Sequence, residues 1–575
     1  LLGLKSMKLI ENCTMFLKNN KINKFWLFFI VLFLLTLFMM FSFQPGNYLF
    51  LGHDIDFHFL RMQALIKAIQ EGSFPVYIDH EVVNGYGYPT KWFYPDVILI
   101  PFALLATVTN IIFAYKALLF TMSILCGVFM YITLKRIYKS SYVAAVGSLL
   151  YTFSFYRIQD LFERSALAEA LSFTFVPIAF LGLYEIIKGN YKKWYILSLG
   201  VTFLIFTHVL SMFLAVMTLG IVTLFYIKPL WQEKKRMYYL LLSAIVTIFL
   251  SAYFLFPLIE QMQSNTFYYK TNPLFYIETF TMNILSILWC FSFINIFPNQ
   301  DKDIFLASMG ILMAISVCLR LFVREKSKLM KSVDIGVFIG VLYVFASSTI
   351  FPWGMFPFTK LSIIRFPWRL YEFASYFFSI GGAYYSYRLL KSEKYRLLAV
   401  FFVIGATVFI IYTESTACKA KFLAYDPAKF ERNSGNYYSQ GALEYIPAKV
   451  PSVEYMEERG DSIRTKHKET ITSDFIKNKG VVSVEVNPQD KKESVELPLF
   501  YYKGYTAKLN GEEKPIQESE NGLLEVDNIN RKGKIEVVFS GTNIQKISPY
   551  ITLVSMLLLC IYVIWNRKRK RTDTH

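Results

Sequence analysis

Long apolar runs separated by short polar segments make up most of the chain. The first run, at residues 25–43, is long enough to cross a bilayer as a helix, and the last, at 550–565, lies just before five consecutive basic residues. Between these two runs the pattern predicts ten further crossings, several of them short. They lie at 111–134, at 141–156, in a segment that ends near 187, twice within 194–227, and at 238–256, 304–322, 333–348, 370–387 and 395–412.

Two other apolar runs do not fit as crossings. Residues 97–107 contain Pro101 and are too short to span, which favours a helix that lies in the membrane interface. Residues 282–297 favour a re-entrant hairpin, because only one crossing fits before the next basic cluster. The predicted fold class is therefore an all-α polytopic membrane protein with about twelve transmembrane helices.

One long segment before the last apolar run has a different pattern. Residues 413–547 are mostly polar, and alternating or β-branched runs at 481–486, 494–497 and 535–539 indicate strands. The pairs Asn510-Gly511 and Asn521-Gly522 are typical of turns. The sequence thus predicts three parts: a transmembrane domain at 1–412, a small β-rich domain at 413–547, and a final helix with a basic tail at 548–575.

Composition supports the membrane class. Of the 575 residues, 54% are hydrophobic and 18% aromatic, and the mean hydropathy of +0.38 lies outside the range of soluble globular proteins. The six cysteines show no spacing typical of metal sites or disulfides. A soluble enzyme and a zinc-binding module are therefore excluded.

The distribution of charge sets the expected orientation in the membrane. The formal charge is +18, but the basic residues form short clusters between apolar runs, as expected for cytoplasmic loops, so a nucleic-acid partner is not expected. Both termini are predicted to be cytoplasmic, with the lipid bilayer as the surrounding partner. The first loop, 44–110, and the β-rich domain are then predicted to lie outside.

The first external loop concentrates ionisable groups next to a predicted span. His53, Asp54, Asp56 and His58 lie within six residues, and Arg61 follows. Such groups near hydrocarbon must be solvated or paired, which points to a functional site. If the segment is helical, Asp54, His58 and Arg61 share one face; if it is extended, Asp54 and Asp56 point to the same side.

Either geometry allows one carboxylate to act as a base. The alternative is that Asp54 caps the following helix while Asp56 interacts with the helix dipole in its first turn. Both roles remain open, and so does a divalent cation held by the two aspartates and nearby histidines. No cofactor is otherwise required, and a metal ligand set cannot be assigned from the sequence.

Two further features have a binding and a structural interpretation. Tyr86 and Tyr88, within Gly85-Tyr86-Gly87-Tyr88-Pro89, offer aromatic faces for a sugar, or they belong to a rigid loop. His208, at the predicted turn between two short crossings, is placed to hydrogen-bond a substrate or to serve the turn itself.

Charged residues also gather at the start of the fourth predicted crossing. Arg164 is suited to hold a phosphate through its fork of donors, and Glu169, inside the apolar segment, is suited to orient it or a sugar hydroxyl. Arg157 and Asp160 fit a salt-bridge network between helix ends better than a binding role. The segment as a whole is predicted to face the outside.

A second basic pair lies at a predicted external loop. Arg365 and Arg369 flank Phe366-Pro367-Trp368. They either bind a lipid-linked phosphate or extend their side chains to the interface beside a belt of aromatic residues.

These motifs resemble a known family. The segments 53–58, 85–89, 93–95, 157–169 and 366–369 are similar to those of the bacterial YfhO-like membrane proteins and of the related group labelled as having a 6-pyruvoyl-tetrahydropterin synthase-related membrane domain. These proteins resemble the GT-C glycosyltransferases, which take a sugar from a polyprenyl-phosphate carrier outside the membrane and use an acidic residue of the first external loop. The resemblance implies that Asp54 or Asp56 is the catalytic residue, with Asp54 the first choice.

The expected function follows from the resemblance and the topology together. It is the transfer of a sugar from an undecaprenyl-phosphate donor to a cell-envelope glycopolymer or lipid acceptor at the outer face of a bacterial plasma membrane. The alternative is a transporter or flippase for a lipid-linked or polar solute. A non-enzymatic assembly or sensor protein would leave the first-loop aspartates without a task.

Overall fold

The chain divides into two compact units, each assembled from three separated segments. The computed structural model describes residues 23–272, 276–289, 307–418, 422–424, 443–488 and 493–572. Unit 1 consists of Leu1–Ile55, Val108–Ile245 and Phe275–Tyr425, and unit 2 of Asp56–Thr107, Val246–Leu274 and Asp426–His575. Most of the first loop therefore belongs to the same unit as the C-terminal part of the chain. The sequence pattern predicts this loop within the transmembrane domain instead.

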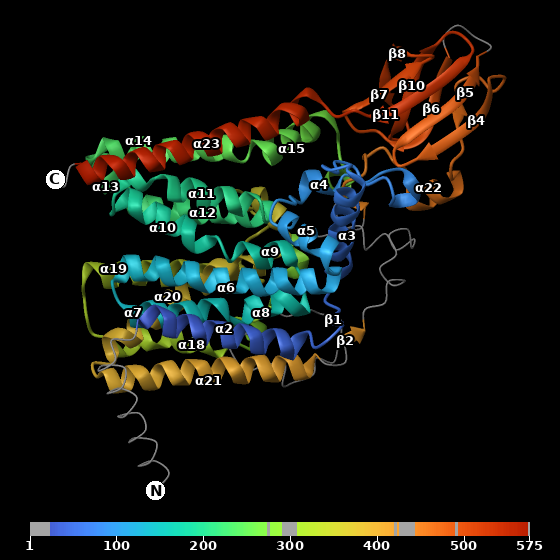
Figure 1. Cartoon of the computed structure of the whole chain (residues 1–575). Coiled ribbons are helices and arrows are strands. Elements are labelled where there is room, and N and C mark those ends of the chain that lie inside the picture. The colour runs from blue at the N-terminus through green and yellow to red at the C-terminus, as the bar shows by residue number, and fades with distance from the viewer. Residues whose placement is uncertain are drawn as a thin grey trace. The chain divides into compact units, whose positions relative to one another are not determined.

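Unit 1 is a bundle of helices with one two-stranded sheet. In the sheet, β1 (Tyr48–Phe50) pairs antiparallel with β2 (Phe422–Ala424). The longer helices run alongside one another, with α7 packed against both α6 and α20, and α19 against α20 (Figure 1). The helices of this unit, including most of α14, are α2 (Lys24–Phe43), α6 (Ile111–Tyr138), α7 (Ser141–Thr152), α8 (Phe155–Ile158), α9 (Leu167–Ser172), α10 (Val176–Ile187), α11 (Tyr195–Ile205), α12 (Val209–Phe225), α13 (Ile227–Gln232), α14 (Lys234–Leu250), α17 (Ile284–Trp289), α18 (Ile311–Cys318), α19 (Lys328–Ala346), α20 (Tyr371–Leu389) and α21 (Glu393–Ala417).

Several helices have the length and composition to cross a membrane. In the described part of the chain there are six, or seven if α14 and α15 (Ala252–Ser264), interrupted at Ser251, form one crossing. This number is below the twelve expected, because many apolar runs form helices that are shorter than a bilayer is thick. The six are Lys24–Phe43, Ile111–Tyr138, Leu167–Ile187, Lys328–Ala346, Glu393–Ala417 and Asn543–Lys568.

Local breaks follow the sequence closely. The run 194–227 is divided into α11 and α12 by a turn at residues 206–208, where two crossings were predicted to meet. The short helix α5 (Ile100–Val108) covers most of the run 97–107 that was expected to lie in the interface and ends one residue beyond it. The predicted hairpin at 282–297 falls partly outside the described residues, and α17 is the part that the structure describes.

Close packing of α10 against α11 depends on small residues. A Cβ atom added at Gly182 of α10 would lie 2.1 Å from the backbone nitrogen of Leu197 in α11, so the two backbones approach too closely for a side chain there. Gly220 of α12, in contrast, has nothing within 4 Å of such a Cβ atom.

Alanine at these two glycines is expected to have opposite effects. Gly182→Ala should lower the free energy of unfolding by about 1–3 kcal/mol, because the helices must move apart. Gly220→Ala, the matched control, should raise it by about 0.5–1 kcal/mol through helix propensity alone. Thermal unfolding of the purified protein in detergent measures both. Equal effects at the two positions would contradict the close contact.

Unit 2 combines helices with two antiparallel sheets. Its helices are α3 (Ile55–Glu71), α4 (Thr90–Phe93), α5, α15 (Ala252–Ser264), α16 (Tyr268–Thr271), α22 (Val453–Arg459) and α23 (Asn543–Thr572). The first residue of α3 and the last residue of α5 are counted with unit 1. One sheet has the strand order β3-β6-β10-β9 and the other β4-β5-β11-β7-β8. The strands are β3 (Arg464–Thr465), β4 (Ile471–Asn478), β5 (Val481–Asn487), β6 (Glu493–Phe500), β7 (Tyr505–Leu509), β8 (Glu512–Lys514), β9 (Ile516–Glu518), β10 (Leu523–Ile529) and β11 (Gly533–Phe539).

The predicted β-rich region before the last helix is confirmed. Alternate residues of β11 are buried, with Ile535 opposite the buried Val484 of β5, while β6 is buried along its whole length. Asn510-Gly511 joins β7 to β8, and Asn521-Gly522 lies between β9 and β10. The core of these sheets also contains Trp92 from the first loop. The sheets and the loop thus share one hydrophobic core.

Candidate functional site

The buried carboxylate of Glu169, in the first turn of α9, lies at the centre of a charged cluster in unit 1. The Glu169 Oε2 atom accepts from Arg164 Nη1 at 3.1 Å and from Arg369 Nε at 3.2 Å. Its Oε1 atom accepts from the Tyr156 hydroxyl at 2.6 Å. The side chains of Glu169, Arg164 and Arg369 are only 2%, 6% and 12% exposed. One carboxylate therefore fixes two guanidinium groups in a poorly hydrated environment.

Arg164 is oriented from a second direction by a π-helical turn, Gln159–Glu163. Within this turn, Asp160 Oδ1 lies 2.5 Å from Arg164 Nη1, and the Arg164 backbone nitrogen donates to the Gln159 carbonyl at 2.8 Å. π-helical turns are rare and often occur at functional sites. Arg157, in contrast, hydrogen-bonds the Thr152 carbonyl and the Ser123 hydroxyl, so it supports the helices and not the cluster.

Arg369 reaches the cluster from the turn before α20. Its Nη1 atom donates to the Ile364 carbonyl at 3.0 Å, and its guanidinium lies 4.9 Å from the centre of the Phe366 ring. The Arg164 guanidinium lies 6.0 Å from the centre of the same ring. Arg365 adopts a left-handed backbone with φ of 60° and is half-buried, and it is Arg369 that pairs with Glu169.

Asp54 is held beside this cluster by backbone hydrogen bonds. The His53 nitrogen donates to the Glu163 carbonyl at 3.2 Å, and the Asp54 nitrogen donates to the Arg164 carbonyl at 2.8 Å. The preceding Gly52 permits this approach, because a Cβ atom there would lie 2.1 Å from the Ser165 hydroxyl oxygen. The sequence therefore needs glycine at position 52 to bring the aspartate to the arginines.

Asp54 is exposed as a residue, although protein surrounds its carboxyl densely. This loss of hydration raises the pKa of Asp54 above its ordinary range, while the charges of Arg164, Arg369 and His53 act in the opposite direction. Asp54 is therefore an acid of an exposed residue under the influence of two arginines, one buried and one half-buried. That combination is what proton transfer next to a bound anion requires.

A second buried acid lies close to the cluster and was not predicted from the sequence. Glu372, in the first turn of α20, accepts from the Ser172 hydroxyl at 2.6 Å and from the Ser211 hydroxyl at 2.8 Å. The Ser211 oxygen also lies 3.0 Å from Nδ1 of His208. The available signal was an acid in an apolar run three residues after Arg369, but its serine partners come from other helices.

His208 has the structural role that was the alternative to substrate binding. It is buried and precedes the first residue of α12, where its Nδ1 atom accepts from the backbone nitrogen of Ser211 at 3.3 Å. An acceptor at this position satisfies one of the free amide groups at a helix start. Through Ser211, His208 is nevertheless linked to Glu372.

The other charged residues of the first loop lie in unit 2. Asp56 is half-buried in the first turn of α3, where the positive end of the helix dipole favours an acid. Arg61 pairs with Asp96 at 3.2 Å and also lies 3.2 Å from Nδ1 of the buried His58. Asp54 precedes the first residue of α3 and interacts with Arg164 and Arg369 in unit 1, whereas Arg61 is bound within unit 2.

The interpretation of Tyr86 and Tyr88 as sugar platforms is wrong for this structure. Both side chains are 0% exposed and belong to the hydrophobic core of unit 2. The Tyr86 hydroxyl donates to the Gly460 carbonyl at 2.6 Å, and the Tyr88 hydroxyl accepts from the Tyr445 nitrogen at 3.4 Å. Their rings are covered by the sheets, so they fix the loop.

The described residues offer few ligands for a metal ion. Among the residues that the structure describes, no three His, Cys, Asp or Glu side chains are close enough together to hold a metal. Asp54 interacts with arginines instead, and these would compete with a cation for its oxygens. A divalent cation at Asp54 and Asp56 stays an untested option.

Comparison with known proteins adds one relative. The chain is 24% identical, over 634 aligned residues, to a protein of Lactococcus lactis subsp. cremoris (strain MG1363) that is described as uncharacterized. The match covers 98% of this chain and 99% of the relative. No protein-family model matches the chain. The relative has no stated activity or substrate to compare with the cluster.

Proposed function

We propose that this protein is a membrane glycosyltransferase that moves one sugar from a polyprenyl-phosphate donor to a cell-envelope acceptor. The observation that carries the proposal is the carboxyl of the exposed residue Asp54 beside the two arginines fixed by Glu169. The resemblance of the first-loop and arginine motifs to the YfhO-like and GT-C proteins supports the same reaction class. Helices able to cross a membrane also support this reaction class, because a polyprenyl donor resides in the membrane.

The arginines would bind the donor phosphate. Arginine suits phosphate because its planar fork of donors matches two oxygen atoms. The Nη2 group of Arg369 has no hydrogen-bond partner in the part of the chain that the structure describes and is not buried, so it is available to a ligand oxygen. Because Glu169 already positions both guanidinium groups, binding requires little reorganisation of the site.

In the transfer step, the acceptor hydroxyl oxygen attacks the anomeric carbon of the donor sugar. The bond from that carbon to the phosphate oxygen breaks, and its electron pair leaves with the polyprenyl phosphate, whose charge Arg164 and Arg369 stabilise. Asp54 accepts the proton of the acceptor hydroxyl. Whether the sugar inverts or retains its configuration depends on how the acceptor approaches.

The proposed setting is the outer face of a bacterial plasma membrane, with undecaprenyl phosphate as the carrier. In this proposal the shorter apolar helices complete about twelve crossings, and both termini face the cytoplasm, as the basic flanks favour. A reporter enzyme fused after residue 575 that is active only in the cytoplasm tests the orientation.

A second candidate is a transporter or flippase. The line of buried polar groups from His208 through Ser211 to Glu372 favours it, since ionisable groups inside apolar segments often mark a translocation path. An acid outside these segments, at the exposed residue Asp54, favours the enzyme. Movement of a labelled lipid-linked sugar across the membrane without cleavage of its sugar bond would support the transporter.

The deciding experiment reconstitutes the full chain in vesicles with undecaprenyl-phosphate sugars that carry a label on the sugar. A panel of donors is supplied together with envelope fractions as acceptors. The proposal expects protein-dependent movement of label from the lipid into the acceptor fraction, with release of undecaprenyl phosphate. If every donor remains intact while the protein is folded, the enzymatic proposal is wrong.

The pH dependence of the transfer rate is expected to report the raised pKa of Asp54. Only the deprotonated carboxylate accepts a proton, so the rate should fall as the pH falls through the pKa of Asp54. Burial raises this pKa, which places the acid limb above the value of about 3.9 for an ordinary aspartate. The check is kcat/KM measured against pH at constant ionic strength. An acid limb at or below the ordinary value would contradict the assignment.

A further inference from the structure

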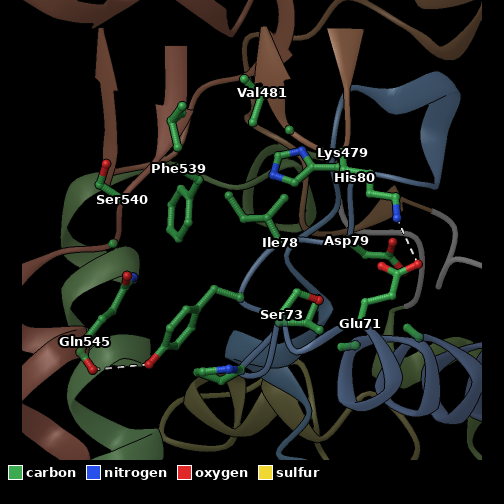
Figure 2. Close-up of a pocket in the computed structure, with 18 of the residues that line it drawn as sticks. Glu71, Ser73, Ile78, Asp79, His80, Lys479, Val481, Phe539, Ser540 and Gln545 are labelled. Atoms are coloured by element: carbon green, nitrogen blue, oxygen red, sulfur yellow. Dashed lines mark hydrogen bonds and ion pairs between the residues drawn. The ribbon is translucent and has the colours of Figure 1, made fainter. Parts of the chain in front are cut away.

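Unit 2 contains a cavity of about 520 Å³ that the sequence did not predict. It is lined by α3, by residues 73–81 of the first loop, by the turn before β5, by the end of β11 and by the start of α23. Figure 2 shows Phe539 and Gln545 on one side of this cavity and Glu71 and Lys479 on the other. Its volume lies within the range of about 300–1,000 Å³ that is usual for sites of small ligands.

Aromatic rings form one part of the wall. The rings of Tyr77 and Phe539 have their centres 6.3 Å apart, and the Tyr77 hydroxyl donates to the Gln545 carbonyl at 3.2 Å, a bond drawn in Figure 2. Tyr550 also lines the cavity and is 69% exposed. Such rings offer apolar faces against which the C–H groups of a sugar ring can pack.

The opposite part of the wall carries charges that cancel. Lys479 forms an ion pair with Glu71 at 2.8 Å, and Lys67 forms one with Glu81. These pairs leave carboxylate oxygens and ammonium protons near the cavity as hydrogen-bonding groups without a net charge. Pairs of this kind are suited to several hydroxyl groups and not to a single strong ion.

The remaining ionisable groups of the cavity wall add no net charge. Asp79 and Lys546 contribute one negative and one positive charge, and Asp79 Oδ1 accepts from the Glu81 nitrogen at 3.1 Å. Burial, assisted by the charge of Lys477, lowers the pKa of His80 to about 4, so its imidazole is neutral near pH 7. Sites for phosphates or polyanions carry an excess of positive charge, which this wall lacks.

We propose that this cavity binds a neutral glycan, with sugar rings packed against Tyr77, Phe539 and Tyr550 and hydroxyl groups hydrogen-bonded to the paired lysines and carboxylates. In the proposed transferase the glycan is the acceptor, and this role rests on the proposed function. Glycan binding by the cavity does not depend on it.

Binding is tested with the full chain in detergent on an array of neutral and anionic glycans, followed by calorimetric titration of those that bind. The expected result is binding of at least one neutral glycan. Ser73, exposed on the cavity wall, provides the blocking variant: Ser73→Trp should raise the Kd at least tenfold. Ser473→Trp, at an exposed serine of β4 outside the wall, is the matched control and should leave the Kd unchanged.

Charge selectivity is tested by Lys546→Glu, at an exposed residue of the wall. A neutral glycan should keep its Kd within threefold, whereas an anionic ligand would lose affinity more than tenfold. Binding restricted to anionic glycans, equal effects of the two tryptophan variants, or no bound glycan on the whole array would each overturn the proposal.

Asp54→Asn separates this inference from the proposed enzyme. Asp54 belongs to the cluster of unit 1, so the variant should lose sugar transfer and keep glycan binding. Transfer without any glycan binding would refute the cavity proposal alone. Glycan binding without transfer from any donor would refute the transferase alone.

Discussion

Asp54→Asn is expected to lower the rate of sugar transfer by about 10²–10⁴-fold, the usual contribution of a general base. Asparagine keeps the shape of the side chain, but its amide cannot accept the proton of the acceptor hydroxyl. The backbone hydrogen bond from residue 54 to the Arg164 carbonyl is unaffected by the change, so the turn should persist. Initial rates in vesicles at saturating donor measure the effect.

Asp56→Asn is the matched control, since it makes the same chemical change two residues along the chain. Asp56 belongs to unit 2, where it is half-buried in the first turn of α3, and burial is the cause that raises its pKa, so most of the activity should remain. The reverse result would make Asp56 the base. Full activity in both variants, with normal folding, would remove the first loop from the catalytic mechanism.

Glu169→Ala is expected to lower the free energy of unfolding by about 3–5 kcal/mol. The change removes one ion-pair partner of Arg164, which keeps its pair with Asp160, and leaves Arg369 without an ion-pair partner in the described part of the chain. A buried charge without its partner is strongly unfavourable because water cannot replace the lost contact. Thermal unfolding in detergent, followed by loss of helical signal, is the measurement.

An exposed ion pair of the same unit provides the comparison. Glu393 pairs with Arg396 at 2.8 Å, but its side chain is 68% exposed. Glu393→Ala should cost no more than about 1 kcal/mol, because solvent screens the pair. Similar losses for both alanine variants would show that Glu169 does not hold the cluster together.

The parts of the fold set by local patterns were predictable. The first helix, the break at 206–208 between α11 and α12, and the strands β5, β6 and β11 follow from apolar runs, polar turns and alternation. The number of crossings is not determined by the pattern, because apolar composition does not distinguish a full span from a shorter apolar helix such as α7 or α18.

The site was predictable in its residue types and less so in its contacts. Arg164, Glu169 and Arg369 were chosen as charged groups in or beside apolar segments, and the structure brings them together. Glu372 was missed because its serine partners lie on other helices. For Tyr86 and Tyr88 the sequence left a sugar platform and a rigid loop open, because a loop rich in glycine and tyrosine shows no sign of the strands, more than 350 residues along the chain, that bury it.

The core of unit 2 also has a consequence for synthesis of the chain. Tyr86, Tyr88 and Trp92 are covered by residues from 443 onwards, and β11 at Gly533–Phe539 completes its sheet. While the ribosome adds the intervening residues, these aromatic side chains have no partner strands. Until the C-terminal strands have been synthesised, the nascent chain should therefore expose an aggregation-prone aromatic loop. A chain stopped before residue 443 should be sensitive to proteases and should depend on chaperones.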